Sequence, residues 1–140
     1  MSFANPAPDR IRDLLQGART LAVVGLSPNP ARPSHGVARA MRGFGYKIIP
    51  VRPATDAVLG EPAVPDLKSL PGPVDIVDVF RAPEHVDDIV EDCIALKLPA
   101  LWLQEGVVNE AAAQRARAAG MLVVMDRCIY KDYRALVAPH

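Results

Sequence analysis

The fold of this chain is decided by the stretch Leu21-Ala22-Val23-Val24-Gly25-Leu26-Ser27-Pro28-Asn29-Pro30-Ala31-Arg32-Pro33-Ser34-His35-Gly36. Its first four residues form an unbroken apolar run, and Val37, Ala38 and Met41 continue it with helical spacing. A buried strand, a turn rich in glycine, serine and proline, and a helix start therefore follow one another. Backbone N–H groups at the start of a helix attract anions, so we expect this turn to bind a phosphate.

Apolar runs alternate with helical patterns along the rest of the chain, which is typical of an α/β domain. The expected strands cover residues 20–25, 46–51, 74–80, 100–103 and 121–125, and the expected helices lie near 11–18, 34–44, 83–94, 109–120 and 129–137. Prolines crowd residues 50–73, where we expect a loop, a short edge strand near 61–64 and a helical turn at 66–70. The pattern predicts a doubly wound, mostly parallel Rossmann-like sheet of five to six strands with helices on both faces.

The composition limits the kinds of protein to which this chain can belong. The chain has 140 residues, half of them hydrophobic, which predicts a single domain over residues 1–140. Sixteen basic and sixteen acidic residues give a formal charge of zero, which argues against a nucleic-acid partner. Cys93 and Cys128 match no zinc spacing, as expected of a reduced cytoplasmic protein. Neither a secretory signal nor an apolar stretch of about 18 residues is visible, so no membrane association is expected.

Ligands of doubly wound sheets bind outside the carboxyl ends of the strands. The first loop there offers Gly25 for close approach of a ligand, the hydroxyls of Ser27 and Ser34, and Arg32 for a two-pronged phosphate contact. Three prolines and an arginine favour a phosphate site. The alternative interpretation is an ordinary connection in which Ser34 only caps the helix.

The loops after the next strands narrow the choice of ligand. The first turn lacks the Gly-x-Gly-x-x-Gly fingerprint, and Arg52 stands where an acidic residue would hold the ribose of NAD. Arg52 could accept the ribose phosphate that NADP and coenzyme A carry, or it could be a solvated surface arginine. Arg81 could line the cleft beside Phe80. Gln104 and Glu105 could face either the cleft or solvent.

We find no catalytic or metal-binding constellation in the sequence. His35, His85 and His140 stand apart from one another and are expected to be solvated. Cys128 precedes a helix start, where a thiolate is favoured, but we expect it to be buried and inert. The sequence therefore predicts a protein without catalytic residues or a metal, although a fold could bring His35 beside Cys128.

Six stretches together resemble the family of small single-domain CoA-binding proteins, whose fold matches the CoA-binding domain of the succinyl-CoA synthetase α-subunit. The resemblance covers residues 12–136 and rests on residues 22–27, 32–34, 45–51, 74–81, 102–107 and 126–128. It implies a Rossmann-type domain that binds coenzyme A or an acyl-CoA at the carboxyl edge of the sheet. The implied pyrophosphate contacts are Gly25, Ser27, Arg32 and Ser34.

The resemblance also assigns the rest of the groove. It implies that Arg52 lies near the adenosine 3′-phosphate, where relatives often have Asn-Pro, and that Phe80 and Arg81 line the groove beyond. The chain ends before a domain carrying the phosphorylated histidine of the synthetase could begin. We therefore expect a non-catalytic carrier, sensor or partner subunit of an acyl-CoA enzyme.

Other functions stay open at this point. One alternative is an enzyme, either an NADP-dependent reductase or an acyl transferase that uses Cys128. Another is an interaction domain with a vestigial cleft. An exposed edge strand near Glu61 and the apolar C-terminal helix could support a homodimer.

Overall fold

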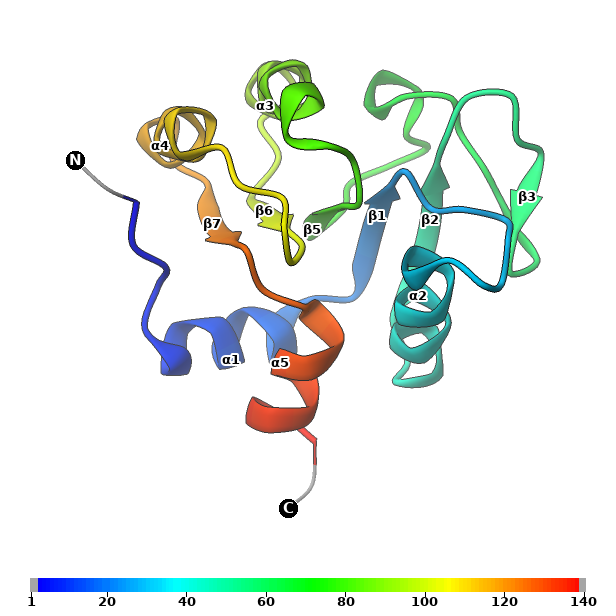
Figure 1. Cartoon of the computed structure of the whole chain (residues 1–140), viewed down its shortest axis with the longest axis horizontal. Coiled ribbons are helices and arrows are strands. Elements are labelled where there is room, and N and C mark those ends of the chain that lie inside the picture. Colours follow the sequence, from blue (N-terminus) through cyan, green and yellow to red (C-terminus); the bar gives the residue numbers. More distant parts are fainter. Residues whose placement is uncertain (1–2, 139–140) are drawn as a thin grey trace.

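A computed structural model describes residues 3–138 as a five-stranded parallel sheet with helices on both faces (Figure 1). The strand order is β2-β1-β5-β6-β7. The strands are β1 (Thr20–Val24), β2 (Lys47–Val51), β5 (Ile76–Val79), β6 (Ala100–Leu103) and β7 (Leu122–Met125). The chain runs outward from β1 in one direction to β2 and in the other to β5, which makes the predicted doubly wound Rossmann-like sheet.

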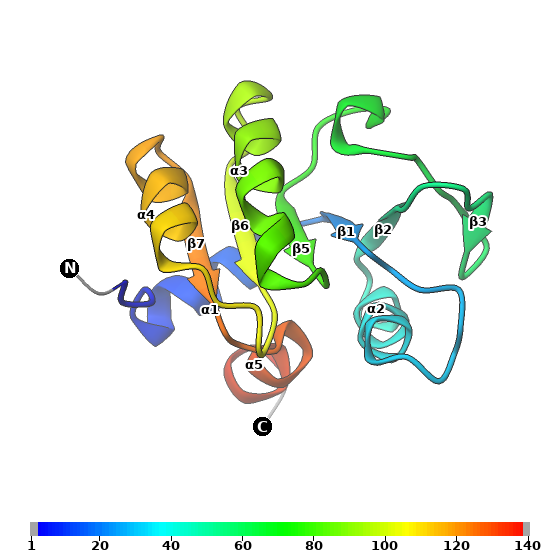
Figure 2. The ribbon, with the colours of Figure 1, turned by 45° about the horizontal axis from the view of Figure 1, so that its top comes forward.

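Two layers of helices cover the sheet (Figure 2). Alternate strand residues point to opposite faces, so Val77 and Leu101 pack in one apolar cluster while Ile76 and Trp102 pack in the other. The first cluster includes α3 (Val86–Ala95) and α4 (Glu110–Ala118), and the second includes α1 (Pro8–Gly17), α2 (Pro33–Gly43) and α5 (Ile129–Leu136). Both faces of the sheet are therefore buried, as a parallel sheet requires.

The proline-rich segment differs from the expected edge strand at 61–64. β3 (Ala57–Val58) and β4 (Glu61–Pro62) form a separate antiparallel hairpin, and Val64 makes a single parallel bridge to Val51. Proline has no N–H to donate, so Pro62 and Pro65 prevent a longer ladder. The sheet has five full strands and a one-residue contact at its β2 edge.

Two short 3-10 turns complete the fold. η1 (Leu67–Ser69) is the expected helical turn, and the Asp66 carboxylate accepts a hydrogen bond from the Ser69 N–H at 3.0 Å. The helix expected from residue 83 begins later, with α3 at Val86. Its first three expected residues form the 3-10 turn η2 (Pro83–His85) instead. Asn109 caps α4, because its side chain accepts from the Ala112 N–H at 3.1 Å.

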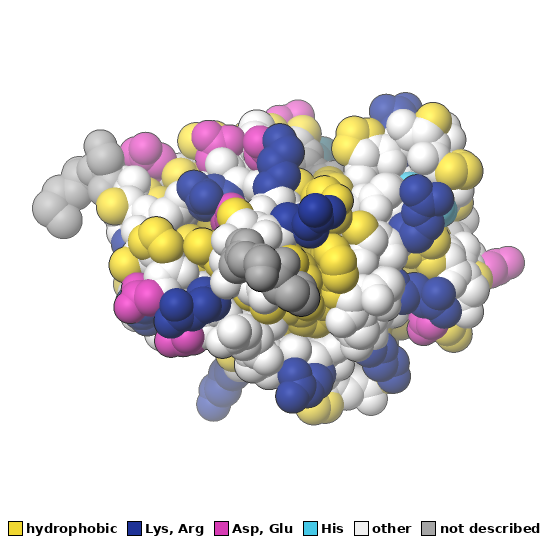
Figure 3. Space-filling model, turned by 90° about the horizontal axis from the view of Figure 1, so that it is seen from below, with side chains coloured by type: hydrophobic (Ala, Val, Ile, Leu, Met, Phe, Trp, Pro, Cys, Tyr) yellow, Lys and Arg dark blue, Asp and Glu magenta, His cyan; other side chains and the backbone are white. Residues whose placement is uncertain are grey.

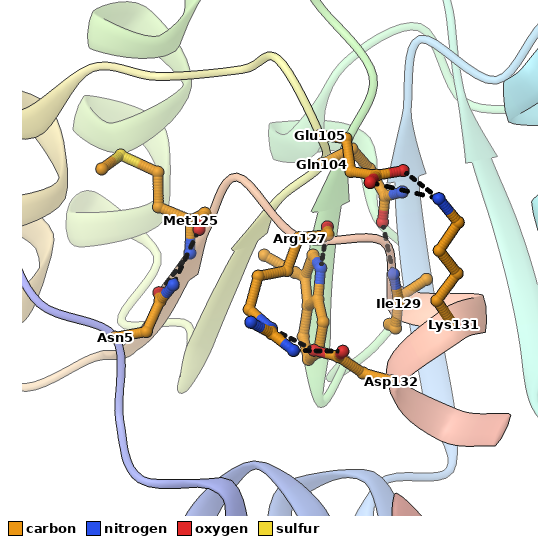
Figure 4. Close-up of polar contacts among 9 residues, drawn as sticks. Asn5, Gln104, Glu105, Met125, Arg127, Ile129, Lys131 and Asp132 are labelled. Atoms are coloured by element: carbon orange, nitrogen blue, oxygen red, sulfur yellow. Dashed lines mark hydrogen bonds and ion pairs between the residues drawn. The ribbon is translucent and has the colours of Figure 1, made fainter. Parts of the chain in front are cut away.

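The N-terminal segment covers the β7 edge. Asn5 Nδ2 donates to the Met125 carbonyl at 2.9 Å, and the Met125 N–H donates to Asn5 Oδ1 at 2.7 Å (Figure 4). One side chain thereby satisfies backbone groups that an unprotected edge strand would present to other chains.

Hydrophobic side chains gather on the lower face of the molecule (Figure 3). On α5, Tyr133 stacks on Phe44 with ring centroids 4.1 Å apart. Phe44 is 36% exposed. A homodimer formed through the edge strand near Glu61 and the C-terminal helix stays a prediction. Within residues 3–138, no helix has the length and apolar character that crossing a bilayer requires.

Candidate functional site

A cavity of about 1090 Å³ lies at the carboxyl edge of the sheet. The loops that follow all five parallel strands contribute to its walls. It therefore spans the switch point beside β1, where the topology predicts a ligand. The structure brings together all seven residues predicted from the sequence, which are Gly25, Ser27, Arg32, Ser34, Arg52, Phe80 and Arg81.

Gly25 sits where β1 passes into the first loop. Its φ is +82°, and a Cβ atom built there would lie 2.7 Å from the Phe80 carbonyl oxygen and 2.8 Å from Arg81 Cδ. Its N–H donates to the Val51 carbonyl at 2.9 Å. Only glycine fits this backbone conformation and this contact without strain.

The first loop is held in shape by its own hydrogen bonds. The Ser27 N–H donates to Ser34 Oγ at 3.0 Å, and the Asn29 N–H donates to Ser27 Oγ at 3.1 Å. Arg32 is the N-cap residue of α2, so the interpretation of Ser34 as the cap is wrong. Ser34 is buried and ties the loop to the first turn of α2, which fixes the backbone that faces the cavity.

Three arginines give the cavity a positive charge. Within residues 3–138, Arg32, Arg52 and Arg81 form no ion pair. The acidic residue that lines the cavity is Glu105, and Lys131 Nζ lies 3.1 Å from its carboxylate. Because Glu105 is already neutralised, the three guanidinium groups are left to attract a ligand with several negative charges.

At its β6 and β7 end the cavity is lined by Gln104, Glu105, Val107 and Cys128, and Glu105 is the charged residue among them. Gln104 is 4% exposed, and its Oε1 accepts a hydrogen bond from the Ile129 N–H at 3.1 Å (Figure 4). Cys128 is 7% exposed and is the N-cap residue of α5. Both residues line the cavity. The sequence did not show whether Gln104 faces the cleft or solvent. Its burial on the cavity wall shows that it faces the cleft.

The turn that carries Cys128 is anchored on both sides. Arg127 Nε and Nη2 donate to the Asp132 carboxylate at 2.7 and 2.8 Å, and the hydrogen bond to Asp132 raises the pKa of Arg127. The Arg127 carbonyl accepts from Trp102 Nε1 at 2.8 Å. These contacts attach the start of α5 to β6 (Figure 4). They also fix the backbone next to Cys128.

Sequence reasoning missed the remaining lining residues. These are Pro28, Asn29, Pro33, Val37, Pro53 and Val107. Val37 could have been found, because it stands three residues after Ser34 and shares its helix face. Val107 gives no such signal, since an apolar residue in a loop does not reveal which way it points.

Asp78 is a buried acid outside the cavity lining. It lies on β5 between Val23 and Trp102 in the paired strands, and it is 1% exposed. Its Oδ1 has no hydrogen-bond partner among the described residues, and burial raises the pKa of its carboxyl well above the ordinary value. Burial therefore favours the uncharged form of the Asp78 carboxyl.

The described residues hold no recognisable metal site. Across residues 3–138, no group of three or more His, Cys, Asp or Glu is placed to hold a metal ion. His35 is not among the described residues that line the cavity, so the structure does not place it at the ligand surface beside Cys128. His140 lies outside the described residues.

Comparison with known proteins agrees with this geometry. A family profile described as a CoA binding domain matches residues 19–134. YneT of Bacillus subtilis, an uncharacterized protein, is 46% identical over 125 residues, which cover 89% of this chain and 93% of YneT. A Thermus thermophilus structure has a TM-score of 0.89 at 37% identity and covers 94% of this chain and 99% of its own. The structure of Prb, a PH1109 protein redesigned for binding, has a TM-score of 0.93 at 28% identity, covering 99% and 97%.

Proposed function

This chain belongs to the family of CoA-binding domains, and we propose that it binds coenzyme A or an acyl-CoA in the cavity at the carboxyl edge of its sheet. The observation that carries the proposal is the set of three arginines without ion-pair partners in the described chain, Arg32, Arg52 and Arg81, around that cavity. Coenzyme A carries a pyrophosphate and a 3′-phosphate, and guanidinium groups pair well with phosphate oxygens.

The proposed ligand orientation follows the walls of the cavity. The pyrophosphate binds the first loop, where Gly25 allows close approach and Ser27, Arg32 and Ser34 supply hydrogen-bond donors. Arg52, at the end of β2, binds the adenosine 3′-phosphate. The pantetheine arm then passes Phe80 and Arg81.

We propose a non-catalytic role, as a carrier, a sensor or a subunit that presents CoA to an acyl-CoA enzyme. The described wall of the cavity combines one cysteine with one glutamine and one glutamate, and it holds no histidine that could serve Cys128 as a base. We also propose a cytoplasmic location, because Cys93 and Cys128 are both free thiols.

The non-catalytic role is tested by incubating the protein with acetyl-CoA and following the release of free CoA thiol. We expect saturable binding and no release above the rate in buffer. Turnover that disappears in Cys128→Ala would contradict a pure binding role and would support the acyl transferase. Turnover of NADPH would support the reductase instead.

A further inference from the structure

A second cavity, of about 200 Å³, lies at the opposite edge of the sheet from the first. Arg19 and Tyr46 line it, and they directly precede β1 and β2, so the cavity is at the amino ends of these strands. Its other walls come from the C-terminal ends of α1 and α2 and from α5 (Figure 1). Among the described residues, the two cavities share no lining residue. A ligand at the amino edge therefore does not compete with one at the carboxyl edge.

Aromatic rings form one side of this second cavity. Tyr133 of α5 stacks on Phe44 with ring centroids 4.1 Å apart and an interplanar angle of 14°. Tyr46 meets Tyr133 edge-on, with centroids 5.9 Å apart and an angle of 80°. Leu15 and Val137 add further apolar residues to the wall. An apolar cavity of about 150 Å³ accommodates benzene, so this one has room for a single aromatic ring and a small polar group.

Arg19 is the charged residue in the wall of the second cavity. Its Nη1 donates to the Gln16 and Ala18 carbonyls at 3.3 and 3.4 Å, and both of these residues line the cavity. The end of α1 therefore holds the guanidinium at the cavity wall. Within residues 3–138, Arg19 forms no ion pair. The nearby Asp75 carboxylate accepts the Arg19 and Thr20 backbone N–H groups, at 2.8 and 3.0 Å.

We propose that this cavity is a second ligand site, which binds a compact aromatic carboxylate of about the size of benzoate. The ring packs against Phe44 and Tyr133. The carboxylate pairs with Nε and Nη2 of Arg19, which have no hydrogen-bond partner among residues 3–138. A planar guanidinium edge matches the two oxygens of a carboxylate and so selects an anion over an uncharged ring. The inference does not rest on CoA binding, because the two cavities lie at opposite edges of the sheet.

The test is an NMR titration of the isotopically labelled full chain with sodium benzoate at neutral pH. We expect a saturable shift of the Gly45 amide signal and none at Gly25 in the other cavity, with a dissociation constant on the order of 1 mM or lower. Benzyl alcohol lacks the charge and acetate lacks the ring, so each should bind at least about tenfold more weakly than benzoate. The absence of a saturable shift at Gly45, or binding of acetate as tight as that of benzoate, would overturn the proposal.

Two variants locate the ligand in this cavity. Arg19→Gln should weaken benzoate binding at least about tenfold and leave benzyl alcohol unchanged, because only the carboxylate uses the guanidinium. Phe44→Ala should weaken the binding of both, since the ring loses one wall, and Phe44 is exposed enough to be removed without loss of the fold. Arg10→Gln is the matched control, because Arg10 is an exposed arginine of α1 outside both cavity linings. The same benzoate affinity in Arg19→Gln and Arg10→Gln would overturn the proposal.

A further arm separates this site from the proposed function. When CoA is added to the benzoate-saturated protein, we expect the shift at Gly45 to remain. Displacement of benzoate by CoA would place benzoate in the carboxyl-edge cavity and would overturn the second site. A protein that binds benzoate at Gly45 but does not bind CoA would support the second site and contradict the proposed function.

Discussion

The carbonyl oxygen of Phe80 closes over Gly25 so tightly that a Cβ atom at residue 25 would lie 2.7 Å from it. This contact joins the ends of the neighbouring strands β1 and β5 at the floor of the cavity. The side chain of Arg81 lies against the same glycine, with its Cδ 2.8 Å from that Cβ position. The geometry of the phosphate loop therefore depends on the absence of a side chain at one position.

Gly25→Ala should lower the free energy of unfolding by about 2–4 kcal/mol, because it combines a strained positive φ with a backbone clash. Urea denaturation measures this loss, and Gly106→Ala is the matched control. Gly106 has a φ of +81° but nothing within 4 Å of its Cβ position, so its loss should be about 1–2 kcal/mol. Equal losses of unfolding free energy in the two variants would mean that the contact between the residue-25 Cβ and the Phe80 carbonyl adds no strain.

Ser34→Ala should destabilise the protein by about 1–2 kcal/mol, because the Ser27 N–H loses its acceptor. It should also weaken CoA binding, since the first loop loses the bond that fixes its shape. Ser69→Ala, at an exposed hydrogen bond to Asp66, is the control and should cost less than about 0.5 kcal/mol. Unchanged stability and unchanged CoA affinity in Ser34→Ala would show that the loop is ordered without this bond.

Arg32→Ala should weaken CoA binding about tenfold or more, because a charge-assisted phosphate contact contributes roughly 1.5–3 kcal/mol. Arg39→Ala is the control, since Arg39 is an exposed arginine of the same helix, α2, outside the cavity lining. Titration calorimetry at two salt concentrations gives both affinities. If Arg32→Ala binds CoA as tightly as Arg39→Ala does, Arg32 does not contact the bound CoA.

Asp78→Asn should stabilise the protein, and more at pH 7 than at pH 4. Burial raises the pKa of the folded carboxyl above its value of about 3.9 in the unfolded chain. Above pH 4 the unfolded state loses the proton while the folded state keeps it. Wild-type stability therefore falls as the pH rises toward the folded pKa, by up to about 1.4 kcal/mol per pH unit.

Asparagine does not titrate, so the Asp78→Asn variant escapes this loss. Urea denaturation of both proteins at the two pH values measures the difference. Asp88→Asn, an exposed carboxylate of α3, controls for the change of net charge. An equal effect of Asp78→Asn at pH 4 and pH 7 would mean that Asp78 is ionised in the folded protein.

The alternation of apolar runs and helical patterns predicted the sheet well. Five apolar runs, each separated from the next by a helical pattern, are compatible with few folds other than a parallel α/β sheet. It could not predict the Asn5–Met125 contact, which joins residues 120 positions apart through a single side chain. The residues of the first loop were predictable because they directly follow β1. The role of Gln104 was not, since the direction of a side chain after a strand depends on the packing of α5 against β6.

Titration calorimetry of the purified protein with CoA, NADP and NAD in parallel tests the central claim most directly. The account predicts saturable binding of CoA, and no binding of NAD or NADP, because the cavity combines three arginines with a first loop that lacks the dinucleotide fingerprint. Binding of NADP in place of CoA, or of no ligand by the folded protein, would contradict it.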